Sequence, residues 1–145
     1  MSKQYFKNLE PAAVGEQRSL DELIENIQFN EQGLIPVVSQ DMGTGEVLML
    51  AYMNIEALKR TLDSGQMTFW SRSRQAYWCK GETSGHLQTL VEMRLDCDGD
   101  ALLCKVEQTG PACHTNRRGC FYLRVDGNTA MVEIMDSVQQ GADTI

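Results

Sequence analysis

Apolar residues recur along this chain with two periods, one typical of helices and the other of strands. The stretch SLDELIENIQF has the helical period, and Ser19 and Glu22 are placed to form a capping box at its start. Its apolar stripe consists of Leu20, Leu23, Ile24 and Ile27. The stretch NIEALKRTLDSG is the clearest predicted helix, because Asn54 can cap its start and Gly65 can end it. Its apolar face is expected to carry Ile55, Leu58 and Leu62.

Most of the remaining chain has the alternation of strands. Apolar runs predict strands over residues 34–40 and 47–52, and the stretches QMTFWSRS and AYWCK have aromatic strand character. From residue 87 to residue 97, the alternation places four residues on the apolar side: Val91, Met93, Leu95 and Cys97. Asp98-Gly99 predicts a hairpin, and the apolar side of its return strand consists of Leu102, Cys104 and Val106. A last hairpin is expected from CFYLRV and AMVEIM around DGNT.

These elements together predict an α+β fold, mainly of antiparallel strands with about two helices. A chain of 145 residues is expected to form one domain. We expect a loosely ordered N-terminal lead-in at residues 1–18, the folded domain at 19–135 and a C-terminal tail at 136–145. Residues 109–119, with the sequence TGPACHTNRRG, predict an irregular loop.

Charge and composition narrow the class of protein. No apolar run approaches the roughly 20 residues that span a bilayer. The N-terminus lacks the apolar region of a signal peptide, so we expect a cytoplasmic protein with no membrane partner. The net charge of −7 disfavours non-specific binding of nucleic acid. An odd number of cysteines, five, in such a protein favours metal ligands or nucleophiles over disulfides.

Cations are nevertheless concentrated in two places. The stretch FWSRSRQAYWCKG contains Arg72, Arg74 and Lys80 and no acid. Arg117 and Arg118 form a second basic spot. Guanidinium groups suit phosphate oxygens because they donate paired hydrogen bonds, so both places indicate a small anionic ligand. Composition alone is equally compatible with ordinary solvated arginines.

The stretch LDCDGDAL gathers carboxylates and a thiol in one place. Strand alternation turns Cys97 to one side and Asp96 and Asp98 to the other, with Asp100 following the glycine. A thiolate suits zinc, whereas carboxylate oxygens suit magnesium or calcium, so two separate cations fit this composition. The alternative is a solvated turn, which Asp and Gly often form.

Three cysteines, Cys97, Cys113 and Cys120, have a C-x15-C-x6-C spacing that differs from the paired spacing of structural zinc sites. Three thiolates without a fourth protein ligand would suit a catalytic zinc with water in the open position. Cys104 lies on the apolar side of a strand, which predicts a small buried side chain. His114 is a candidate proton relay, a fourth ligand or an ordinary loop residue, and the sequence leaves these three open.

Four stretches, in this order and at these distances, resemble the phosphoribosyl-AMP cyclohydrolase family: FWSRSR, WCKGETSGH, DCDGDALL and GPACHTNRRGCF. The resemblance runs from about residue 34 to residue 121. It implies a histidine-biosynthesis hydrolase that opens the adenine ring of 1-(5-phosphoribosyl)-AMP at the N1–C6 bond. Some members carry a second hydrolase domain, and because ten residues follow Met135 here, we expect the single-domain form.

The resemblance implies a role for each matching residue. Zinc would be held by Cys97, Cys113 and Cys120, and magnesium by Asp96, Asp98 and Asp100. The family's motifs line the active site, so a nucleotide substrate with two phosphates would contact Arg72, Arg74, Lys80, Glu82, Thr83 and Ser84. Our own mechanistic hypothesis is that His114 relays a proton. The family further implies an intertwined homodimer, in which Cys97 of one subunit faces the other two cysteines of its partner.

Two positions depart from the family pattern. Asn116 replaces a usual Gly, and Gly119 replaces a common Ser. Both departures affect the conformation of the loop and leave the candidate ligands intact. Two competing hypotheses remain: a non-catalytic zinc module that fastens two subunits, and a thiol redox protein. The second is disfavoured because the chain has no C-x-x-C motif.

Overall fold

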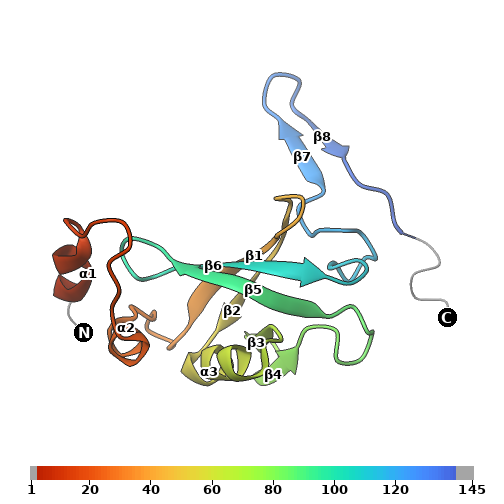
Figure 1. Cartoon of the computed structure of the whole chain (residues 1–145). Helices are drawn as coiled ribbons and strands as arrows, with labels where there is room; N and C mark the ends of the chain where they lie inside the picture. The colour runs from red at the N-terminus through yellow and green to blue at the C-terminus, as the bar shows by residue number, and fades with distance from the viewer. Residues whose placement is uncertain (1–2, 140–145) are drawn as a thin grey trace.

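The computed structural model describes residues 3–139 and has the architecture shown in Figure 1. The described helices are α1 (Gln4–Leu9), α2 (Leu20–Asn26) and α3 (Ile55–Ser64). The described strands are β1 (Ile35–Asp41), β2 (Val47–Met53), β3 (Thr68–Ser71), β4 (Ala76–Cys79), β5 (Gln88–Leu95), β6 (Leu102–Gln108), β7 (Leu123–Asp126) and β8 (Met131–Ile134). The α+β class and the mainly antiparallel pairing are confirmed, and α1 makes the described helices three.

The main sheet has four strands in the order β2-β1-β6-β5. β1 and β2 form the predicted hairpin, and β5 and β6 form the hairpin predicted at Asp98-Gly99, where Gly99 has a positive φ of 74°. The two hairpins join through β1 and β6, which run parallel with Val37 opposite Leu102. This parallel pair makes the sheet mixed, and local alternation in the sequence did not predict it.

The core lies where the two central strands meet α3 and β3. Alternate residues of β1 and β6 are buried, among them Ile35, Val37, Cys104 and Val106. Phe69 of β3 is fully buried in the same cluster. The prediction that Cys104 is a small buried side chain is confirmed, and burial raises the pKa of its thiol to about 12.

Side-chain caps begin both predicted helices. The Ser19 hydroxyl accepts a hydrogen bond from the Glu22 N–H at 3.3 Å, and Asn54 Oδ1 accepts one from the Ala57 N–H at 2.9 Å. Gly65 ends α3 in the left-handed conformation, with φ of 76°. The predicted apolar face of α3 is wrong at one position. Ile55, in its first turn, is exposed, and the buried positions are Ala57, Leu58 and Thr61.

Two further sequence predictions are corrected. The ladder between β5 and β6 shifts register between Leu90 and Glu92, so Val91 bulges outward and is 48% exposed. The lead-in contains α1, whose Phe6 is buried with its ring in the space that a side chain at Gly99 would occupy. α1 escaped prediction because it is short and has no side-chain cap. Of the tail expected at 136–145, residues 140–145 lie outside the described residues.

Two small antiparallel ribbons complete the architecture, β3 with β4 and β7 with β8. Figure 1 shows β7 and β8 projecting away from the main sheet. Apolar side chains of this ribbon are exposed: Leu123, Val125, Met131, Val132 and Ile134. Among residues 3–139, no helix has the length and apolar character needed to cross a membrane.

Candidate functional site

The irregular loop at residues 109–120 brings two of the candidate zinc ligands together. Its two sides are joined by backbone hydrogen bonds from the Ala112 N–H to the Arg118 carbonyl, 3.0 Å, and from the Cys113 N–H to the Arg117 carbonyl, 3.1 Å. Its exit is fastened to β2, where the Cys120 N–H donates to the Leu48 carbonyl at 2.6 Å. We call residues 109–120 the thiol loop. Its ladder holds Cys113 and Cys120 on one fixed piece of backbone.

The Cys113 thiol has surroundings that favour its anionic form. Cys113 is only 6% exposed, and burial by itself raises the pKa of its thiol. Hydrogen bonds from Thr115 and Cys120 and the positive charge of Arg117 outweigh burial, so the pKa lies below its usual value. The Thr115 hydroxyl donates to Cys113 Sγ at 3.1 Å. A thiol with a lowered pKa loses its proton more readily, and the resulting thiolate is the form that binds metals.

The pKa of Cys120 is shifted in the opposite direction, above its usual value. Cys120 is exposed as a residue, but partial desolvation of its thiol, followed by the neighbouring Cys113 thiolate, raises the pKa of this thiol to about 11. The Lys80 ammonium acts against this rise. Lys80 itself is partly desolvated, which lowers its pKa, while the two thiols favour its charged form. Lys80 therefore interacts electrostatically with Cys113 and Cys120, although the sequence grouped it with Arg72 and Arg74.

The neighbouring arginines of the thiol loop are both engaged with the protein. The Arg117 guanidinium lies over the Tyr122 ring at 4.1 Å, and its Nε donates to the Asp136 carbonyl at 2.8 Å. Arg118 Nη2 donates to Asp41 Oδ1 at 2.8 Å. The sequence grouped Arg117 and Arg118 as a free basic spot. The structure instead gives each of them intramolecular partners.

Cys97 lies elsewhere. It is exposed in the turn between β5 and β6, beyond one end of β6, whereas the thiol loop begins beyond the other end. The predicted apolar parity does not reach Cys97, because β5 ends at Leu95 and the turn changes direction. Within residues 3–139 of one chain, no group of three or more His, Cys, Asp or Glu side chains is close enough to hold a metal ion.

The acidic turn is organised by one of its own carboxylates. Asp96 Oδ1 accepts the N–H groups of Asp100, at 2.9 Å, and Ala101, at 3.3 Å. Burial raises the pKa of Asp96, but these hydrogen bonds outweigh it and lower the pKa overall. Its hydrogen bond with Asp96, followed by burial and the charges of Asp96 and Asp98, raises the pKa of Asp100. Three exposed carboxylates thus lie in one turn, and the magnesium site expected there stays a prediction.

The remaining candidate substrate residues lie on two other turns. Arg72 and Arg74 are exposed between β3 and β4, where the Arg72 guanidinium lies over the Tyr52 ring at 4.0 Å beside Trp70 in an open groove. Glu82, Thr83 and Ser84 are exposed in the turn after β4. Glu82 lines a groove with Tyr77 and Cys79, separate from the groove at Arg72. His114 is exposed on the thiol loop beside Cys113.

His86 joins two of these segments and was not assigned a partner from the sequence. It is buried against the start of the thiol loop, where a Cβ on Gly110 would lie 2.7 Å from its ring. Its carbonyl accepts from the Gln108 side chain at 3.2 Å, and its N–H donates to the Ser84 hydroxyl at 3.1 Å. Its position directly after the ETSG turn was the available signal, but only the folded chain reveals the contact with Gly110.

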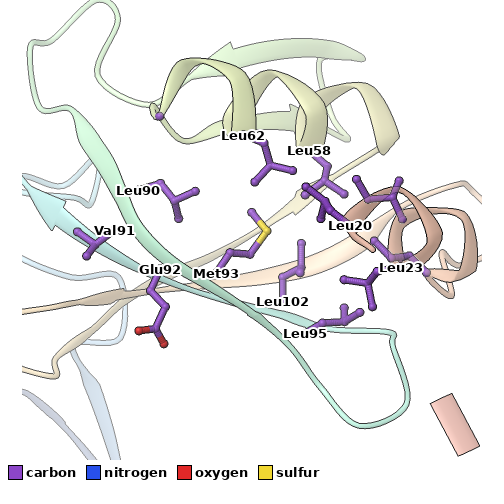
Figure 2. A pocket seen from close by; sticks show the side chains of 13 residues that line it. Leu20, Leu23, Leu58, Leu62, Leu90, Val91, Glu92, Met93, Leu95 and Leu102 are labelled. Atoms are coloured by element: carbon purple, nitrogen blue, oxygen red, sulfur yellow. The ribbon is translucent and has the colours of Figure 1, made fainter. Parts of the chain in front are cut away.

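A separate apolar groove lies between α2, α3 and β5. Figure 2 shows Leu20 and Leu23 of α2, Leu58 and Leu62 of α3, and Leu90 and Met93 of β5 facing into it. Its lining contains one ionisable residue, Glu92. The groove therefore has little acid–base chemistry to offer, and it shares no lining residue with the thiol loop.

The fold is that of a small α+β protein in which one loop holds two neighbouring thiols, Cys113 and Cys120. The family model of phosphoribosyl-AMP cyclohydrolase matches residues 49–122. Proteins named phosphoribosyl-AMP cyclohydrolase are similar over most of this chain. That of Dinoroseobacter shibae is 62% identical over 111 residues, 76% of this chain and 92% of its own length. That of Alkalilimnicola ehrlichii is 55% identical over 123 residues, 85% and 87% of the two lengths.

A third relative, from Cereibacter sphaeroides, is 65% identical over 97 residues, 67% of this chain and 82% of its own length. The chain belongs to the phosphoribosyl-AMP cyclohydrolase family, a family of hydrolases. The family resemblance inferred from the four sequence stretches is confirmed. The matched segment contains the thiol loop, the acidic turn and the turns that carry the candidate substrate residues.

Proposed function

We propose that this chain hydrolyses 1-(5-phosphoribosyl)-AMP in histidine biosynthesis, by adding water at C6 of the adenine ring and breaking the N1–C6 bond. The observation that carries the proposal is the thiol loop, which places Cys113, with a lowered pKa, beside Cys120 in a member of this family. The amino group at C6 would remain as part of a carboxamide. The reaction therefore differs from deamination at the same carbon.

The donor set of the thiol loop fits zinc. We infer that zinc is held by Cys97, Cys113 and Cys120, with the two loop thiols supplied together by one chain. When bound, zinc would lower the pKa of water to about 7, so that hydroxide is available at neutral pH. The hydrogen bond from Thr115 favours the thiolate that such a ligand requires.

The third thiol would come from a second copy of the chain, in a homodimer with a shared zinc site. Two observations support this proposal. Cys97 and the thiol loop are separated by the length of β6, which is about 20 Å at the usual rise of a strand. The ribbon of β7 and β8 also exposes apolar side chains along both strands, and a two-stranded ribbon alone has marginal stability in water. A partner subunit would cover this ribbon and bring its Cys97 to the thiol loop.

The acidic turn would hold magnesium through Asp96, Asp98 and Asp100. Its carboxylate oxygens are the ligands that a hard divalent cation prefers. The pKa of Asp100 is raised first by its hydrogen bond with Asp96, then by burial and by the charges of Asp96 and Asp98, and a bound cation would offset these charges. With magnesium bound, the turn would offer a binding place for substrate phosphates.

The chain's other candidate residues would bind and orient the nucleotide. Arg72, Arg74 and Lys80 would contact phosphate or ribose oxygens, since these cations lie on exposed or partly exposed turns. Glu82 would orient the base, with Thr83 and Ser84 as hydrogen-bonding neighbours. His114, exposed next to Cys113, would relay a proton between water and the leaving ring nitrogen. Residues 19–135 would form the catalytic unit.

An ultraviolet assay of phosphoribosyl-AMP hydrolysis tests the proposal. The zinc-loaded protein should turn over this substrate, and a chelator should abolish turnover until zinc is restored. The competing hypothesis, a non-catalytic zinc-stapled dimeric module, predicts bound zinc with four protein ligands and no turnover. An absence of turnover in the zinc-loaded protein would therefore contradict the proposed function.

A further inference from the structure

Arg118 uses all three nitrogens of its guanidinium to join separate parts of the chain. Nη2 donates to Asp41 Oδ1 at 2.8 Å, and Nε donates to Glu46 Oε1 at 3.3 Å. Nη1 donates to the carbonyl oxygens of Gly110, at 3.2 Å, and Gln108, at 3.5 Å. The side chain is 25% exposed, so these contacts form in a largely desolvated place.

These contacts connect both ends of the thiol loop to the main sheet. Asp41 ends β1, Glu46 directly precedes β2, and Gln108 ends β6. Gly110 lies at the entry of the thiol loop and Arg118 at its exit, where the Arg118 carbonyl also accepts the Ala112 N–H. The guanidinium thereby holds the loop entry, the loop exit and the ends of the sheet strands in one arrangement.

The charge of Arg118 is already balanced. Two carboxylates face its guanidinium, and the Asp41 carboxyl keeps a lowered pKa because of the Thr44 N–H first and the Arg118 charge in addition. An anionic substrate would have to compete with both carboxylates for the same nitrogens. Arg118 is therefore poorly suited to bind phosphate, in contrast with the exposed Arg72 and Arg74.

We propose that Arg118 is a positioning residue, which fixes Cys113 and Cys120 through the backbone of the thiol loop and does not touch the substrate. Its contribution to turnover rests on the proposed function. A lysine could keep the charge but could not donate from three nitrogens to four acceptors in a planar fork. A methionine would leave the two carboxylates without their cation.

Amide hydrogen exchange of the metal-free protein tests the positioning directly. In Arg118→Lys and Arg118→Met, the amides of Ala112, Cys113 and Cys120 should exchange about tenfold faster or more, while amides of β6 keep their wild-type rates. The control is Arg18→Lys, whose arginine forms an exposed ion pair with Glu16 and should leave all these rates unchanged. Unchanged loop rates, or equal acceleration in the loop and in β6, would overturn the proposal.

Turnover separates positioning from anion binding. The positioning role predicts that kcat falls about tenfold or more in both variants, with KM within about threefold of wild type. An anion-binding role predicts a raised KM in Arg118→Met and recovery in Arg118→Lys, and that result would overturn the proposal. Since hydrogen exchange needs neither zinc nor substrate, a wild-type protein without turnover would defeat the proposed function while the exchange result still decides whether Arg118 positions the loop.

Discussion

Cys97 lies in the turn that precedes β6, and Cys113 lies in the loop that follows the other end of the same strand. The strand is a central member of the main sheet, and its buried alternate residues fix its length and direction. A strand of this kind cannot fold back to bring the two thiols together. This separation is the reason why we propose that the metal site is shared between two copies of the chain.

Cys113→Ala should abolish turnover and reduce bound zinc, because it removes a thiol whose surroundings lower its pKa. Zinc content per folded subunit, measured by elemental analysis beside the ultraviolet assay, checks this expectation. The matched control is Cys104→Ala. It removes a thiol buried in the core whose pKa is about 12, so it should lower stability and keep zinc. One zinc per subunit together with full turnover in Cys113→Ala would contradict the ligand assignment.

His114→Ala should lower turnover by roughly 10²–10⁴-fold with zinc retained, since this is the usual contribution of general acid–base catalysis. The side chain is exposed, so the fold should tolerate its removal. Kinetics and zinc content of the same preparation check the prediction, and added imidazole should restore part of the rate. Loss of zinc from this variant would instead make His114 a ligand.

Gly119→Ser should destabilise this chain, although the family resemblance implies a serine at this position. A Cβ at residue 119 would lie 3.2 Å from the carbonyl oxygens of Val47 and Leu48, closer than ordinary van der Waals contact. We expect a loss of about 1 kcal/mol in the free energy of unfolding, measured with urea. Gly127→Ala is the control, because nothing lies within 4 Å of a Cβ at residue 127. Equal stability of Gly119→Ser and wild type would show that β2 yields at this contact.

Asp41→Asn should lose stability in a manner that depends on pH. The pKa of Asp41 is lowered in the folded chain, mainly by the Thr44 N–H, with Arg118 contributing. Its stabilisation is therefore complete above the ordinary carboxyl pKa of about 4 and is lost as the pH falls through the folded value. The difference in unfolding free energy from wild type should be about 1–3 kcal/mol at pH 6 and should shrink towards pH 3.

Urea unfolding at pH 6, 5, 4 and 3 checks this dependence on pH. Asp63→Asn, at an exposed position of α3, is the control and should follow the wild-type curve. A difference between Asp41→Asn and wild type that stays constant from pH 6 to pH 3 would show that the Asp41 charge does not contribute.

Local signals in the sequence predicted the elements that depend on local interactions. Asn54 and Gly65 mark the two ends of α3 because capping involves only near neighbours. Asp98-Gly99 marks the hairpin because a positive φ at Gly99 is a property of the turn itself. The bulge at Val91 escaped prediction, since it depends on the register with β6.

The contacts that organise the site are distant in sequence, and this explains what was missed. The parallel pairing of β1 with β6 joins segments more than sixty residues apart, from Val37 to Leu102. The ion pair between Arg118 and Asp41 spans a still longer stretch. Composition could show that Arg118 is basic, but only the fold shows that its charge is used within the protein. The residue types of the thiol loop, by contrast, made Cys113 and Cys120 candidate ligands, and the structure places both on this loop.

Complementation between inactive variants tests the central claim, a zinc site shared between two subunits. Cys97→Ala and Cys113→Ala should each be inactive alone. After the two are unfolded together in equal amounts and refolded, half of the dimers should be mixed, and each mixed dimer should contain one complete site. Turnover should therefore recover to about a quarter of the wild-type value. The matched pair Cys113→Ala and Cys120→Ala should recover no turnover. Both changes lie in the thiol loop, so each of the two sites in a mixed dimer would contain a damaged loop. No recovery from the first pair, in refolded protein that is dimeric, would contradict the shared site.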